Sequence, residues 1–199
     1  GLAQDIMKHP SVRIFGVPDP TLYCDHVTYD NELVGRLAAE YILDRGCKRI
    51  AYIGKSDLQD GVFHHRVEAF RKRLTEGGGT LTVFETPWTN DFTAIDIQLT
   101  QILAMDPRPD GLFVAADGIA SAVVTHLYRL NIHIGKDLQL ISCDNVAHRD
   151  PFLPWRFPSI DICSGQIGEM AARQIIERVM NPDMPRTVKI LTPRLVLPS

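Results

Sequence analysis

The chain has 199 residues, of which 45% are hydrophobic and 23% are charged, and its formal net charge is −3. This apolar content is enough to fill a buried core, and it excludes a chain that is disordered throughout. The slightly acidic balance gives no basic surface for nucleic acid, and the densest basic cluster, residues 71–73, fits an exposed helix face.

Strand and helix patterns alternate along the chain. Apolar runs predict strands, in chain order, at residues 12–17, 49–54, 81–85, 111–116, 137–143, 159–162 and 187–193. Helical periodicity predicts helices between them, at residues 30–46, 65–75, 92–105, 119–130 and 166–180. Because strand–helix alternation builds parallel sheets covered on both faces, we expect an α/β fold with a doubly wound parallel sheet.

The predicted elements are unevenly distributed. Residues 29–155 and 185–199 contain enough strands and helices for one complete lobe. Residues 1–28 and 156–184 contain too few for an independently stable covered sheet. These residues are either an appendage or part of a second lobe, and we favour the second: two lobes, of which the amino-terminal one is partial, with its first strand–helix units preceding this chain.

Two predicted strands run directly into an aspartate, Asp117 or Asp144, and a third is followed by Asp57 after two intervening residues. The carboxyl ends of parallel strands share one edge of a sheet, and ligands of open α/β sheets bind at that edge. For Asp57 and Asp117, capping of the following helix explains the residue equally well. No helix start follows Asp144, so ligand contact is favoured there.

Other candidate ligand residues lie in the predicted loops at the same edge. Arg66 begins the helix after the loop of residues 55–65, and its guanidinium suits bidentate hydrogen bonding, although a surface cation fits the pattern equally well. Trp88 and Phe92 lie between a strand and a helix. We expect one of these rings to stack on a ligand and the other to plug the core.

Motifs for catalysis, cofactors and metals are missing from the sequence. It contains no phosphate-binding glycine loop, no dinucleotide fingerprint and no nucleophile elbow, which favours a binding protein over an enzyme. The four cysteines form no C-x-x-C pair and the seven histidines are scattered, so we expect no metal site. No apolar run is long enough to span a membrane and no secretion signal opens the chain, so we expect a cytoplasmic protein without a cofactor.

Five segments resemble the effector-binding core of the lactose-repressor/galactose-repressor (LacI/GalR) family of transcription regulators. They cover nearly the whole chain: TYDNELVGRLAAEYILDRGCKRIAYIG, RVEAFRKRL, PDGLFVAADGIASAVVTHLYRLNIHIGKDLQLISCDN, FPSIDICSGQIGEMAARQII and ILTPRLVLPS. The resemblance implies a two-lobed, periplasmic-binding-protein-like fold with a small-molecule effector between the lobes. It also implies roles for Arg66 as a hydrogen-bond donor, Asp144 as an acceptor and Phe92 as a stacking residue.

Two positions depart from the pattern of the family. Ala116 stands where many members carry Asn, and Gly16 stands where sugar-binding members often carry Asp. Both departures remove a polar contact, which argues against a simple sugar as the effector.

The resemblance also implies partners. It implies a homodimer through the helix of residues 119–130, where Ala122, Val123 and Leu127 are candidate contacts. A core role is the alternative for all three and is favoured for Val123. It further implies operator DNA, bound through a helix-turn-helix headpiece upstream of Gly1 that this chain lacks. The alternative is a solute-binding protein or the sensor-input module of a transporter or kinase, which a secretion signal upstream would favour.

Overall fold

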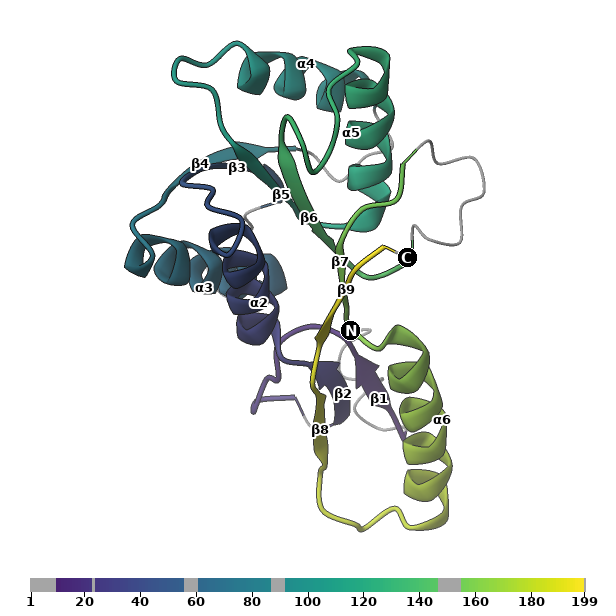
Figure 1. The fold of residues 1–199 in the computed structure, drawn as a ribbon. Helices are drawn as coiled ribbons and strands as arrows, with labels where there is room; N and C mark the ends of the chain where they lie inside the picture. The colour runs from purple at the N-terminus through teal and green to yellow at the C-terminus, as the bar shows by residue number, and fades with distance from the viewer. Residues whose placement is uncertain (1–9, 23, 56–60, 87–91, 147–154, 199) are drawn as a thin grey trace. The chain divides into compact units, whose positions relative to one another are not determined.

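The computed structural model describes residues 10–22, 24–55, 61–86, 92–146 and 155–198. The chain divides into two compact units, which are described separately below. The larger unit comprises Asn31–Asp161 with Arg194–Ser199, and the smaller comprises Gly1–Asp30 with Ile162–Pro193 (Figure 1).

The larger unit is built on a six-stranded sheet in the order β4-β3-β5-β6-β7-β9. All neighbouring pairs are parallel except β7 and β9. The strands are β3 (Arg49–Gly54), β4 (Thr80–Glu85), β5 (Gly111–Val114), β6 (Gln139–Cys143), β7 (Ser159–Asp161) and β9 (Arg194–Val196). Every residue of the central β5 is buried, which explains why its sequence is continuously apolar.

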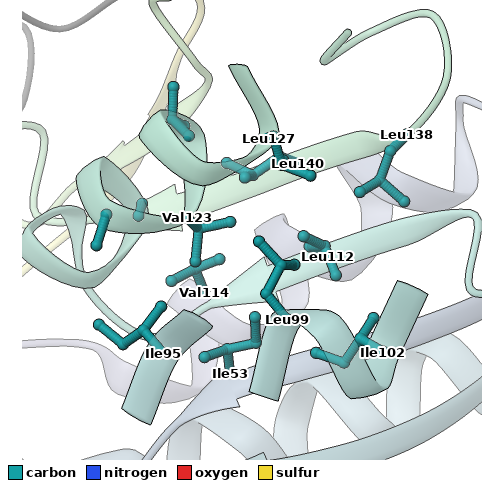
Figure 2. Packing of buried hydrophobic residues seen from close by; sticks show 14 of the residues in the cluster. Ile53, Ile95, Leu99, Ile102, Leu112, Val114, Val123, Leu127, Leu138 and Leu140 are labelled. Atoms are coloured by element: carbon teal, nitrogen blue, oxygen red, sulfur yellow. The ribbon is translucent and has the colours of Figure 1, made fainter. Parts of the chain in front are cut away.

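Helices cover both faces of this sheet, so the predicted doubly wound α/β fold is confirmed. The helices are α2 (Asn31–Leu43), α3 (Val62–Glu76), α4 (Phe92–Leu103) and α5 (Asp117–Arg129). Leu112 and Val114 of β5 pack with Leu99 of α4 and Val123 of α5 in the main hydrophobic cluster (Figure 2). The intervening Phe113 points to the other face, where its ring stacks on Phe70 of α3 at 4.5 Å.

The α5 residues with two candidate roles lie in the core. Ala122, Val123 and Leu127 belong to the hydrophobic cluster and are 7%, 0% and 0% exposed. Side chains buried in this way cannot contact a second subunit, so their assignment as dimer contacts is wrong.

The smaller unit contains a three-stranded parallel sheet in the order β1-β2-β8. Its elements are β1 (Val12–Ile14), β2 (Asp25–Tyr29), β8 (Val188–Leu191) and α6 (Ser164–Met180). Arg178 of α6 forms a buried salt bridge with Asp25 of β2, with Nη2–Oδ1 and Nε–Oδ2 distances of 2.8 and 3.0 Å. The backbone N–H of Thr187 donates to the same carboxylate at 2.8 Å, which ties the approach to β8 into this network.

Three segments fall in a different unit from the one predicted, and the shortest of them, residues 29–30, lies in the smaller unit. Residues 156–161 were expected in the amino-terminal lobe, but β7 pairs with β6 and so belongs to the larger unit. Residues 185–193 were expected in the other lobe, but β8 pairs with β2 in the smaller unit. The predicted strand of residues 187–193 is β8 alone, and the chain enters the larger unit as β9 only after Pro193.

None of the helices within the described ranges combines the length and the apolar content that a membrane crossing requires.

Candidate functional site

The predicted site residues that the structure describes lie beside the carboxyl edge of the larger unit's sheet. β3, β5 and β6 are neighbouring parallel strands that end at Gly54, Val114 and Cys143. The chain segments that follow these ends therefore lie along one edge. Asp117 and Asp144 come directly from this edge.

Arg66 reaches the same edge from α3. Its side chain is 1% exposed, and its Nη1 donates to the carbonyl oxygen of Ala115 at 2.6 Å. Its Nη2 donates to Oδ1 of Asn31 at 3.4 Å. A charged side chain is almost never buried unless it is paired, so Arg66 is a fixed donor of the interior. The surface-cation interpretation is wrong.

The close approach of α2 and α3 places Arg66. A Cβ atom added at Gly35 of α2 would lie 2.2 Å from the carbonyl oxygen of Arg66 and 2.8 Å from the backbone nitrogen of Phe70. Only glycine fits such an approach, because any side chain would overlap the backbone of α3. The glycine therefore sets the depth at which α3 packs and hence the height of Arg66 above the sheet edge.

Asp144 follows β6 in an unusual backbone conformation. The φ angle of Asp144 is 104° and that of Asn145 is 54°. The N–H of Asp144 donates to the carbonyl oxygen of Ile160 at 2.9 Å. Burial raises the pKa of the Asp144 carboxyl to about 6; the charge of Arg66 opposes this rise and the charge of Asp117 adds to it. The structure thus brings Arg66 and Asp144 within electrostatic reach of each other.

Asp117 is the first residue of α5 and is 1% exposed. The N-cap position is Ala116, without a side-chain cap, so the capping explanation for Asp117 is wrong. Its Oδ1 accepts a hydrogen bond from Oγ of Ser159 and its Oδ2 accepts one from the N–H of Val146, each at 2.7 Å. The carboxylate is therefore directed at the turn that carries Asp144.

Of the two aromatic candidates, one lies within the described residues and the other lies outside them. Phe92 is the first residue of α4 and is 61% exposed, so it does not plug the core. Since α4 follows β4, this ring lies at the carboxyl edge and is available for stacking. Trp88 and Asp57 lie outside the described residues.

Sequence reasoning missed two residues of this edge, Asn31 and Ser159. Both are buried, at 8% and 4% exposure. Asn31 accepts a hydrogen bond from Arg66, and Ser159 donates one to Asp117. Asn31 looks like an ordinary helix start, and Ser159 looks like a small strand residue. Only their neighbours in space reveal their function, and no local pattern does.

The two departures from the family pattern have clear structural settings. Ala116 is 6% exposed and forms an apolar part of the edge. In the smaller unit, Gly16 has a φ angle of 79° and its carbonyl oxygen accepts from Oγ1 of Thr28 at 2.8 Å. A residue with a side chain would be strained at this φ.

The structure also bears on metal and thiol chemistry. Among the described residues, no group of three His, Cys, Asp or Glu side chains could hold a metal ion. Burial raises the pKa of the Cys143 thiol to about 12 and that of Cys47 to about 11, so neither is a thiolate at neutral pH.

A groove of about 540 Å³ lies elsewhere, on the outer surface of α2 and α3. Its lining alternates acids and bases, among them Glu32, Arg36, Glu68 and Lys72. Sites for small molecules are mostly apolar with a few convergent polar groups, so this groove is a poorer candidate than the carboxyl edge.

The chain matches a family model described as "Periplasmic binding protein-like domain" over residues 39–197. Among curated proteins, it is 26% identical over 179 residues to the HTH-type transcriptional repressor PurR of Vibrio cholerae (strain M66-2), covering 88% of this chain and 52% of that protein. It is 25% identical over 187 residues to the ribose operon repressor of Escherichia coli (strain K12), covering 89% of this chain and 56% of the repressor. The chain thus spans about half the length of these relatives.

Solved structures share the fold. A LacI family transcriptional regulator from Enterococcus faecium with bound ribose superposes with a TM-score of 0.82 at 20% identity, covering 94% of this chain and 68% of that one. A putative LacI regulator from Bacillus cereus subsp. cytotoxis superposes with a TM-score of 0.84 at 20% identity, covering 98% and 69%. The family model covers most of the sequence, and the chain belongs to the periplasmic binding protein-like domain family.

Proposed function

We propose that the chain is the effector-sensing core of a DNA-binding transcription regulator. A small polar molecule binds at the carboxyl edge of the larger unit's sheet and changes the operator affinity of the intact protein. The observation that supports this proposal is that a buried donor, Arg66, and an acceptor, Asp144, influence each other electrostatically beside the edge where α/β folds bind ligands. The similarity to repressors supports the regulatory role.

The chemistry of the edge suits a neutral molecule with hydroxyl or amide groups. Arg66 supplies N–H donors in a fixed fork, and Asp144 accepts from hydroxyl or amide hydrogens. The exposed ring of Phe92 offers a face on which a planar or sugar ring can stack. Similar structures carry bound ribose or cellobiose, so these two sugars are the first probes.

Regulation follows from differential binding. An effector shifts a conformational equilibrium only by as much as its affinities for the two states differ. In the intact protein, such a shift would reposition two helix-turn-helix headpieces on an operator whose half-sites mirror a two-fold dimer. The dimer and the operator contact are part of this proposal. Any dimer contact through α5 uses exposed residues such as Tyr128, which is 54% exposed, because its buried face is core.

The test is a metabolite screen followed by calorimetry. A panel of sugars, nucleosides and nucleobases that includes D-ribose and cellobiose is screened for ligands that raise the Tm of the chain. The affinity of each hit is then measured for wild type, Asp144→Asn and Arg66→Lys. Losing a hydrogen bond to a charged group costs about 1.5–3 kcal/mol, so we expect affinity to fall at least about tenfold in both variants.

The matched control is Arg71→Ala. Arg71 lies on the same helix but is solvent-exposed, and it pairs with Glu68 at 3.2 Å. We expect this variant to bind like wild type. A hit whose affinity is unchanged in Asp144→Asn and Arg66→Lys would refute the placement of the site.

A further inference from the structure

A buried hydrogen-bond network lies directly behind Asp144. The Asp117 carboxylate accepts from the hydroxyl of Ser159 and from the N–H of Val146, both at 2.7 Å. The Ser159 hydroxyl oxygen in turn accepts from the N–H of Asn145 at 3.0 Å. We call these contacts the Asp117–Ser159 network. They connect the turn after β6 to the start of α5 and to β7.

The turn needs this support because its backbone is strained. Asp144 and Asn145 have φ angles of 104° and 54°, a region that residues with side chains rarely adopt. Such conformations persist only where surrounding contacts determine them. Three consecutive N–H groups of the turn are held: that of Asp144 by Ile160, that of Asn145 by Ser159 and that of Val146 by Asp117.

The hydrogen bonds of the network argue against direct ligand contact by Asp117 and Ser159, because they hold both side chains on the turn after β6. Asp117 is 1% exposed and Ser159 is 4% exposed, and the polar atoms of both point at the turn. As a whole residue, Asp144 is less buried than Asp117 or Ser159.

We propose that Asp117 and Ser159 are positioning residues of the effector site, which hold the turn of residues 144–146 and thereby aim the Asp144 carboxyl without touching the effector. This rests on the proposed function, because it takes Asp144 as the effector contact. The negative charge of Asp117 has a second effect, since a like charge nearby strengthens the hold of Asp144 on its proton.

The test begins without any ligand. Carbon-13 NMR follows the titration of the Asp144 carboxyl, assigned by its loss in Asp144→Asn, and hydrogen exchange follows the amides of Asn145 and Val146. Asp117→Asn removes the charge, but its amide oxygen still accepts from the N–H of Val146. Its amide nitrogen donates to the Ser159 oxygen, which reverses the direction of that hydrogen bond. We expect its Asp144 midpoint to fall by roughly one pH unit, with the Val146 amide still protected.

Removal of the hydrogen bonds should have the complementary effect. In Asp117→Ala we expect the Asn145 and Val146 amides to exchange at least about tenfold faster, which corresponds to the loss of about 1.4 kcal/mol of local protection. Ser159→Ala should release the Asn145 amide, and Ser159→Thr, which retains the hydroxyl, should restore it. Should Asp117→Ala not fold, Asp117→Asn and Ser159→Ala decide the outcome.

Ser142 supplies a matched control. It pairs with Ser159 in the register of β6 and β7 and is 0% exposed, but its hydroxyl makes no hydrogen bond within the described part of the chain. We expect Ser142→Ala to leave both the titration and the amide exchange unchanged. Wild-type exchange of the Asn145 amide in Ser159→Ala, or of the Val146 amide in Asp117→Ala, would overturn the proposal. An unmoved Asp144 midpoint in Asp117→Asn would refute the charge effect of Asp117.

A ligand from the metabolite panel adds the decisive distinction. If Asp117 only positions and tunes Asp144, Asp117→Asn lowers the pH at which affinity halves and leaves the affinity at high pH nearly unchanged. If Asp117 contacts the effector directly, affinity falls at every pH, and the positioning role is refuted. The ligand-free measurements stand even if Asp144 proves not to bind the effector, so the two proposals fail separately.

Discussion

Gly35→Ala tests how closely α2 and α3 approach and therefore how Arg66 is placed. The new Cβ would lie 2.2 Å from the Arg66 carbonyl oxygen and 2.8 Å from the Phe70 nitrogen, so the two helices must separate by about 1 Å to restore contact distances. Overpacking of this kind costs about 1–3 kcal/mol. Alanine regains up to about 1 kcal/mol of helix propensity, and the severity of the overlap puts the net loss at about 2 kcal/mol.

Equilibrium denaturation, followed by circular dichroism, measures this loss directly. Gly118→Ala is the matched control, because Gly118 lies in the helix α5 of the same unit and an added Cβ there meets nothing within 4 Å. We expect the control to be unchanged or stabilised by about 0.5 kcal/mol. If Gly35→Ala is as stable as Gly118→Ala, the helices do not approach as closely as described, and the account of how Arg66 is positioned is wrong.

Three further predictions follow from the charges and exposures. The pKa of Asp144 in the folded protein is raised to about 6, so its carboxylate destabilises the fold above that pH. The free energy of unfolding should therefore rise by up to about 3 kcal/mol as the pH falls from 8 to 4. Denaturation of Asp144→Asn should lack this rise. Burial opposes ionisation of Asp25, but hydrogen bonds from Arg178 and Thr187 hold its pKa below the usual value. Asp25→Ala, which leaves Arg178 buried without its charge partner, should cost about 3–5 kcal/mol in the smaller unit by thermal unfolding. Phe92→Ala should change stability by less than about 0.5 kcal/mol but weaken effector binding by about 1 kcal/mol in calorimetry, and equal losses in both would contradict its role as an exposed stacking face.

The larger unit was predictable because its central strands are buried on both faces. β3, β5 and β6 appear in the sequence as continuous apolar runs, and the shared edge of their carboxyl ends follows from parallel topology alone. The smaller unit was less predictable. β2 has the sequence DHVTY and was missed, because its buried Asp25 and His26 interrupt the apolar pattern. Its polar groups are satisfied by Arg178 and by the carbonyl of Phe15, partners distant in sequence.

The same limit applies to the candidate site. Arg66 and Asp144 could be proposed from their positions after loops and strands, but burial decided between the alternatives for Arg66. For Asp117, the sequence offered a helix cap or a ligand contact, and the structure shows a third arrangement, hydrogen bonds to Ser159 and Val146. These partners come from β7 and from the turn after β6, and their meeting depends on the order of strands in the sheet.

The most direct test of the account is hydrogen exchange with and without a ligand from the metabolite panel. If the effector binds at the carboxyl edge, protection should increase at the start of α3, at residues 115–117 and at residues 144–146, whose amides follow β5 and β6. The opposite, amino edge of the sheet, at residues 46–48, 108–110 and 131–138, should exchange as before. Protection confined to the amino edge or to the outer groove of α2 and α3 would contradict the account.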